Sequence, residues 1–144
     1  MSIDQLRAYF GFTKMPFSKN IPPSALYPHR GHQEAVARIA FLVDEMAIGV
    51  VTGEVGSGKT VAARAAIAAL EPARHTVIYL PNPAIGTRGL YTEIVSRLGG
   101  EPRYLKAGLI AQATGLLAAE AAERGRRIVI ACDEAHLLDS SQLE

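Results

Sequence analysis

The chain has 144 residues, of which 49% are hydrophobic and 20% are charged, and its formal net charge is +1. That composition is normal for a globular domain with a core, and the near-neutral charge neither demands nor excludes a nucleic-acid partner. The lone cysteine excludes an internal disulfide, and the sequence has neither an apolar signal core nor a run near the roughly 20 apolar residues that span a bilayer, so a cytoplasmic protein is expected.

The first 30 residues predict an arm and a loop rather than part of a compact core. Residues 1–12 indicate a short helix or arm that ends at Gly11. Residues 13–30 are predicted to be extended loop, because prolines remove amide donors and restrict the residue before them; the prolines are Pro16, Pro22, Pro23 and Pro28. A helix is predicted from about Gly31, where apolar residues recur with helical spacing at Val36, Ile39, Ala40 and Val43.

From residue 48 onward, predicted strands alternate with predicted helices. The strands are the β-branched, apolar runs 48–52, 76–80 and 128–132, all expected to be buried. The helices are the alanine-rich run 59–70, a segment marked by Leu90, Ile94 and Leu98, and residues 105–123. This alternation predicts an α/β fold, a three-layer sandwich in which helices cover both faces of a mostly parallel sheet. Ligands of such sheets bind at the carboxyl ends of the strands.

A glycine-rich loop follows the first predicted strand and opens the next helix. It comprises Gly53, Glu54, Val55, Gly56, Ser57, Gly58, Lys59 and Thr60. Glycines allow backbone amides to approach phosphate oxygens closely, and the helix N-terminus adds partial positive charge. Lys59 is predicted to contact the β and γ phosphates, and the Thr60 hydroxyl to bind Mg²⁺. The alternative is a glycine-rich turn that binds no ligand.

Two adjacent carboxylates follow the last predicted strand. Asp133 is predicted to bind Mg²⁺ opposite Thr60, usually through water. Glu134 is predicted to orient or deprotonate an attacking water, so that one carboxylate serves the metal and the other serves as a base. A solvated acidic turn or a helix cap is the alternative.

Other polar residues give weaker indications. Cys132 is interpreted as a core residue rather than a reactive thiol. His136 fits either a contact with the γ-phosphate or a structural role. The arginines before the last strand favour a solvated loop over a nucleic-acid contact; they are Arg124, Arg126 and Arg127.

These motifs resemble those of a known family. Residues 53–60 resemble a Walker A motif, and residues 128–134 resemble a Walker B motif of the AAA+ class. The N-terminal residues narrow the resemblance to ExeA-type ATPases and their TniB-like and TnsC-like relatives that accompany transposases; the matching segments are Tyr9-Phe10-Gly11-Phe12, Pro16-Phe17, Leu26-Tyr27 and His32-Gln33-Glu34-Ala35. Asp-Glu-Ala-His at 133–136 also matches a helicase signature, but nothing else in the chain does. An Asn-Lys-x-Asp motif for guanine is missing from the sequence.

The resemblance implies the rest of the expectations. Residues 1–30 form an N-terminal arm with a proline-rich loop, and residues 31–144 form part of an AAA+ nucleotide-binding domain for ATP and Mg²⁺. In that family another strand lies between the Walker A and Walker B strands, so the sequence ending at Glu144 is expected to be the N-terminal portion of a longer ATPase. Without that strand, Thr60 and Asp133 are expected to be poorly held together, and residues 1–144 to turn over ATP barely.

Two functions and one non-enzymatic alternative follow from the resemblance. The leading hypothesis is a homo-oligomeric ATPase that assists DNA transposition, with double-stranded DNA and a transposase as partners. The alternative is an ExeA-like general secretion ATPase. The third reading is a truncated nucleotide-binding module that does not hydrolyse ATP.

Overall fold

The computed structural model describes residues 2–15, 21–22, 25–27 and 29–143. Its elements in chain order are α1 (Ile3–Phe10), α2 (Arg30–Asp44), α3 (Lys59–Ala68), β1 (His75–Leu80), α4 (Gly86–Arg97), α5 (Lys106–Ala122), β2 (Arg127–Cys132), the 3₁₀ helix η2 (Ala135–Leu137) and α6 (Ser140–Leu143). The predicted helices and the second and third predicted strands are therefore confirmed to within a few residues. The fold is α/β, as the alternating pattern predicted.

The two strands form a parallel pair in which Tyr79 lies opposite Ala131 and Leu80 lies opposite Cys132. Successive side chains of a strand point to opposite faces of a sheet. Ile78 and Leu80 are almost fully buried on one face, whereas Tyr79 is only half-buried on the other. The pairing continues one residue beyond β2, because the Asp133 amide donates to the Leu80 carbonyl at 2.8 Å. The sheet thus places Asp133 at the carboxyl end of both strands.

The main hydrophobic core lies between this sheet and the helices α4 and α5. Ile78 of β1 and Leu109 of α5 are 0% exposed, and Val95 of α4 is equally buried. Partly buried apolar side chains such as Leu116 and Ile128 pack around them. Burial of large apolar side chains stabilises a fold by roughly 1.5–3 kcal/mol each, so this cluster is the main source of stability in the described residues.

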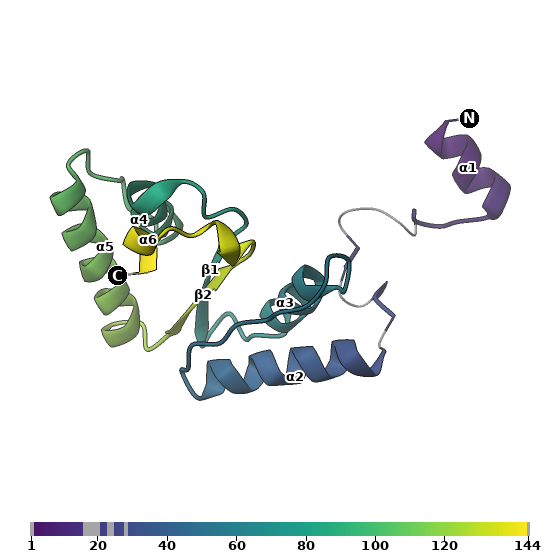
Figure 1. Ribbon diagram of the computed structural model, residues 1–144, viewed down its shortest axis with the longest axis horizontal. Helices are drawn as coiled ribbons and strands as arrows, with labels where there is room; N and C mark the ends of the chain where they lie inside the picture. The colour runs from purple at the N-terminus through teal and green to yellow at the C-terminus, as the bar shows by residue number, and fades with distance from the viewer. Residues whose placement is uncertain (1, 16–20, 23–24, 28, 144) are drawn as a thin grey trace.

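Helices α2 and α3 pack against each other and lie on the other side of the strands from α4 and α5 (Figure 1). The predicted apolar face of α2 is confirmed, since its members are half-buried; they are Val36, Ile39, Ala40 and Val43. Ala62 and Ala66 of α3 are each 3% exposed. Their small side chains allow close packing, as the alanine-rich sequence predicted. The helices therefore cover both faces of the parallel pair.

The prediction of a buried strand at residues 48–52 is wrong. This segment forms no strand, and the side chain of Ile48 is 98% exposed while that of Val50 is 79% exposed. Its backbone instead runs beside α2, where a Cβ on Gly49 would meet Leu42 Cδ1 at 2.1 Å. An extended segment becomes a strand only when a neighbouring strand accepts its backbone hydrogen bonds. Among the described residues, β1 and β2 pair with each other and neither pairs with this segment.

Helix α1 is the element farthest from the rest of the described chain (Figure 1). Its Ser2–Gln5 capping box and the left-handed Gly11 define its ends, which confirms the predicted helix that ends at Gly11. The proline-rich loop is only partly observed, because Pro16, Phe17, Pro23 and Pro28 lie outside the described residues. None of the helices in the described ranges is both long and apolar enough to cross a membrane.

Candidate functional site

The glycine-rich loop lies between the exposed segment 48–52 and the first turn of α3. Gly56 and Gly58 have φ angles of 80° and 88°, a left-handed conformation that side chains with a Cβ rarely adopt. A Cβ on either residue would meet nothing within 4 Å, so backbone conformation rather than crowding explains these two glycines. Gly58 is also the N-cap of α3 and provides no side chain to cap the first-turn amides. Those amides can therefore donate to an anion.

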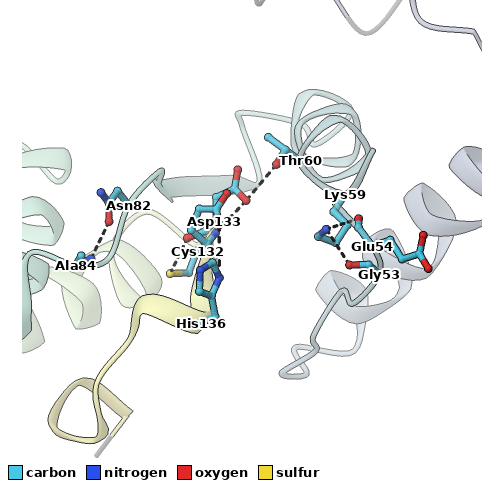
Figure 2. Close-up of polar contacts among 10 residues, drawn as sticks. Gly53, Glu54, Lys59, Thr60, Asn82, Ala84, Cys132, Asp133 and His136 are labelled. Atoms are coloured by element: carbon cyan, nitrogen blue, oxygen red, sulfur yellow. Dashed lines mark hydrogen bonds and ion pairs between the residues drawn. The ribbon is translucent and has the colours of Figure 1, made fainter. Parts of the chain in front are cut away.

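Lys59 lies over this loop. Its ammonium group donates to the Gly53 carbonyl at 3.0 Å and to the Glu54 carbonyl at 2.9 Å (Figure 2). Two neutral carbonyls leave the positive charge without a carboxylate partner in these contacts. A phosphate at the loop would offer this ammonium a stronger, charge-assisted hydrogen bond.

Thr60 and Asp133 come together across 73 residues of sequence. The Thr60 hydroxyl donates to Asp133 Oδ1 at 3.2 Å, as Figure 2 shows. The expectation that Thr60 and Asp133 are poorly held together is therefore wrong for this structure. The pairing of β1 with β2 positions Asp133, and the beginning of α3 lies at the same end of the sheet. The contact therefore forms without the strand that the family resemblance placed between the Walker A and Walker B strands.

Glu134 has a strained backbone and an exposed carboxylate. Its φ is 52°, and non-glycine residues adopt this left-handed conformation at a cost of roughly 1–2 kcal/mol. Its amide donates to Asp133 Oδ1 at 3.0 Å, and its carboxylate lies 3.4 Å from His136 Nδ1. Strained residues of this kind cluster at functional sites. Glu134 and Asp133 are thus adjacent but differently surrounded, while His136 is exposed and contacts the carboxylate of Glu134.

The Asp133 carboxylate accepts a further hydrogen bond that the sequence analysis missed. The Tyr79 hydroxyl donates to Asp133 Oδ2 at 2.8 Å, and the Arg64 guanidinium lies 5.8 Å from the centre of the Tyr79 ring. Partial burial alone would raise the pKa of Asp133, but the hydrogen bonds from Tyr79, Thr60 and the Glu134 amide, together with the Arg64 charge, lower it. Burial and the hydrogen bond to Asp133 raise the pKa of Tyr79. Asp133 is therefore an ionised acceptor and Tyr79 a neutral donor near pH 7.

Cys132 precedes this carboxylate and is half-buried. Burial, reinforced by the negative charge of Asp133, raises the pKa of the thiol. A thiol with a raised pKa is a poor nucleophile, which supports its interpretation as a packing residue.

The arginines before β2 lie largely exposed in a loop and at the start of the strand, as predicted, and they also form ion pairs. Arg124 and Arg126 lie 2.7 Å and 3.5 Å from the carboxylate oxygens of Glu120, which is only 4% exposed. The Thr76 hydroxyl donates to the same carboxylate at 2.5 Å. Arg127 contacts Asp44. The cluster lies at the opposite end of the strands from Asp133, so it stabilises the sheet rather than the candidate site.

Sequence reasoning missed Tyr79, Arg64 and Glu120 because each acts through a contact between distant segments. Tyr79 shows only as an aromatic residue within a strand, and Arg64 as a polar residue in an alanine-rich helix. The strand register was the missing information. Once Tyr79 is paired with Ala131, Asp133 follows two residues later on the same face.

The residues present fit a nucleoside triphosphate with Mg²⁺. The first-turn amides of α3 and the Lys59 ammonium suit phosphate oxygens. The Thr60 hydroxyl and the Asp133 carboxylate, whose oxygens lie 3.2 Å apart, suit a hard cation that prefers oxygen ligands. Such a cation is commonly held by one or two protein groups and by the phosphates of the nucleotide.

Sequence comparison with known proteins identifies a family and a relative. The profile of a family described as "AAA domain" matches residues 32–144. A protein of Aeromonas hydrophila, "General secretion pathway protein A", is 36% identical over 87 residues, which are 60% of this chain and 16% of that protein. The chain therefore aligns with only a small part of the length of this relative. No solved structure matches the chain.

Proposed function

The chain belongs to the AAA domain family, and from this premise we propose that it binds ATP with Mg²⁺ and hydrolyses it. We also propose that residues 1–30 form an arm and residues 31–144 part of the nucleotide-binding domain. The beginning of α2 at Arg30 and of the family match at residue 32 support this boundary.

The contact between Thr60 and Asp133 is the strongest support for the proposal. Two residues that are far apart in sequence place a hydroxyl and an ionised carboxylate together, directly beside a glycine-rich loop and a helix N-terminus. A turn that bound no ligand would not require this convergence. The same contact argues against the reading of Asp133 as a solvated acidic turn, because the carboxylate is partly buried and accepts three hydrogen bonds.

In the proposed site, the loop Gly53–Thr60 binds the phosphates through its amides, and Lys59 turns from the Gly53 and Glu54 carbonyls to the β and γ phosphates. Thr60 and Asp133 would hold Mg²⁺, which would supply positive charge to offset the negative charge of the phosphates. Glu134 would orient the attacking water and accept its proton as the water oxygen bonds to the γ-phosphorus and the bond to the bridging oxygen breaks, which releases ADP and inorganic phosphate. The exposed carboxylate of Glu134 is accessible for that role.

Nucleotide binding is the first test. We expect Lys59→Ala to weaken ATP binding by about 10- to 100-fold, because a hydrogen bond to a charged group contributes about 1.5–3 kcal/mol and tenfold corresponds to 1.4 kcal/mol. Isothermal titration with Mg²⁺ and ATP measures the change. Lys106→Ala is the matched control, since Lys106 is also the first residue of a helix but lies outside the loop. Equal binding by both variants and the unmodified chain would exclude the phosphate site.

Hydrolysis is tested with Glu134→Gln. This change removes the base but keeps the size of the side chain, so we expect unchanged ATP affinity and phosphate release slowed by about 10²- to 10⁴-fold. A variant that keeps the full rate of phosphate release would contradict the role of Glu134. The unmodified chain gives the reference rate in the same assay.

We propose that the protein acts as an ATPase of the general secretion type. We further propose that it is cytoplasmic and forms a homo-oligomer. The similarity to "General secretion pathway protein A" supports this alternative over the transposition role that was first expected. No comparison supports double-stranded DNA or a transposase as a partner, so both stay predictions.

DNA binding separates the two roles. A secretion-type ATPase is expected to show no ATP-dependent binding of labelled double-stranded DNA in fluorescence anisotropy at about 150 mM salt, where non-specific phosphate contacts are weakened. Binding that requires ATP and is lost in Lys59→Ala would instead favour the transposition role. Sedimentation with and without ATP tests the predicted homo-oligomer in the same preparation.

A further inference from the structure

We propose that Tyr79 is a positioning residue for Asp133: its hydroxyl holds the carboxylate in the orientation that the Mg²⁺ site requires. The inference rests on the proposed function, because it assigns a role at the same site. Tyr79 is not part of the Walker A or Walker B segment, and its hydroxyl donates to Asp133 while Arg64 lies over its ring.

The strand pairing explains how Tyr79 reaches Asp133. Tyr79 lies opposite Ala131 in the parallel register, and Asp133 follows Ala131 by two residues on the same face of the sheet. Ala131 has only a methyl side chain, so no bulky group stands between the phenol and the carboxylate. The neighbouring Ile78 and Leu80 point to the opposite face, where they are buried in the core, and this fixes the direction of the Tyr79 side chain.

The two carboxylate oxygens of Asp133 accept hydrogen bonds from different donors. Oδ1 accepts from the Thr60 hydroxyl at 3.2 Å and from the Glu134 amide at 3.0 Å. Oδ2 accepts from the Tyr79 hydroxyl at 2.8 Å. Without the phenol, Oδ2 has no donor among these contacts, and the carboxylate is free to rotate away from Thr60. Outer partners of this kind orient metal-binding carboxylates, and their loss typically weakens metal binding by 10- to 100-fold.

Arg64 also contacts Tyr79. Its guanidinium lies 5.8 Å from the ring centre, a distance at which a cation is attracted to the face of an aromatic ring. Arg64 is on α3, one turn after Thr60, whereas Tyr79 is on β1. The contact therefore ties the helix that bears Thr60 to the strand pair that positions Asp133.

The chain offers a matched control for this arrangement. Tyr104 also has an arginine over its ring, since Arg88 lies 5.0 Å from its centre, but Tyr104 is 81% exposed and distant in sequence from both Walker segments. Tyr79→Phe and Tyr104→Phe each remove one hydroxyl and keep the ring. Only the first removes a donor to Asp133.

The experiment measures ATP binding as a function of Mg²⁺ concentration, with EDTA for the metal-free point. We expect Tyr79→Phe to bind metal-free ATP like the unmodified chain and to need about tenfold more Mg²⁺ for half-maximal enhancement. Tyr104→Phe should match the unmodified chain in both measurements. A general loss of structure would weaken metal-free binding as well, so the two readings distinguish a structural effect from a positioning effect.

A second pair of variants tests whether Tyr79 acts through Asp133. In an Asp133→Asn background, removing the Tyr79 hydroxyl should produce no further change in the Mg²⁺ requirement. An additional increase there would show that Tyr79 acts by another route and would overturn the proposal. Unchanged Mg²⁺ dependence in Tyr79→Phe, with ATP binding still weakened by Lys59→Ala, would overturn the role of Tyr79 while leaving the nucleotide site intact.

An observation on the unmodified chain completes the test without any substitution. With ¹³Cζ-labelled tyrosine, the Tyr79 resonance should shift when Mg²⁺ is added to the ATP complex, while the Tyr104 resonance stays in place. A Tyr79 resonance that does not respond to Mg²⁺ would contradict the proposal. Failure of ATP itself to bind would instead contradict the proposed function.

Discussion

The two sides of the sheet differ sharply in packing. On one side, α4 and α5 bury large side chains such as Ile78, Val95 and Leu109, each 0% exposed. On the other side, the almost fully buried residues of α2 and α3 are only the small Ala62 and Ala66. The adjoining segment 48–52 and most of the glycine-rich loop are exposed. Asp133 lies at the end of the strand pair that the packed side anchors, and the loosely packed side carries the glycine-rich loop.

This difference shows how the candidate site is divided. Asp133 is held rigidly, because its own amide extends the pairing of the strands and its carboxylate is hydrogen-bonded by Tyr79. The loop is joined to that framework mainly through α3, by the Thr60–Asp133 hydrogen bond and the Arg64–Tyr79 contact. The Asp133 carboxylate is thus held by the strand pair, whereas the glycine-rich loop is held mainly by α3.

The largest expected effect comes from removing a core side chain. Leu109→Ala should lower the free energy of unfolding by about 3 kcal/mol, because it removes a fully buried side chain and leaves a cavity. Urea unfolding followed by circular dichroism measures the loss. On the loosely packed side, Ile48→Ala should change stability by less than about 0.5 kcal/mol, because that side chain is 98% exposed. Equal losses of stability in the two variants would contradict the difference in packing between the two sides of the sheet.

A smaller effect on stability is expected from the ion cluster around the buried carboxylate of Glu120. The hydrogen bond from Thr76 and the charges of Arg124 and Arg126 lower the pKa of Glu120 despite its burial. Because the folded-state pKa lies below the ordinary value of about 4.3, the ionised carboxylate stabilises the fold above that pH. This contribution is lost as the pH falls through the folded-state pKa.

Glu120→Gln tests this linkage. The variant should be less stable than the unmodified chain at pH 7, by less than Leu109→Ala, and the difference should shrink as the pH falls below about 4. Thermal unfolding between pH 3 and pH 7 measures it. Part of the acid dependence should persist in the variant, since the pKa of Asp133 is lowered too. A gap that is constant with pH would rule out the ionised form of Glu120 as the cause.

The smallest expected effect is a gain on the loosely packed side. Helix α2 ends in a Schellman motif, in which the Met46 amide donates to the Val43 carbonyl and the Ala47 amide to the Leu42 carbonyl. Met46 has a φ of 52° and is 78% exposed, so Met46→Gly removes backbone strain and little buried surface. We expect a stability gain of about 1 kcal/mol in urea unfolding. A loss would show that the Met46 side chain packs in solution.

Patterns local in the chain predicted much of the molecule. Helical spacing in α2, the alanine-rich run of α3 and the β-branched runs of β1 and β2 each appear in the structure close to where they were expected. The conformation of the glycine-rich loop also follows from its own residues, because Gly56 and Gly58 adopt angles that other residues rarely reach. Binding roles for residues 53–60, Asp133 and Glu134 stay predictions that the variants above address.

By itself, then, the sequence determined the helices, two of the strands, the phosphate-loop conformation and the placement of Asp133 at a strand end, since backbone preference and side-chain periodicity act over a few residues. Only the tertiary structure decided that residues 48–52 remain unpaired, that Glu120 is buried among arginines, and that Thr60 and Tyr79 meet at Asp133. Each of these depends on the register and packing of segments distant in sequence, and a local apolar pattern is the same whether or not a partner strand lies beside it.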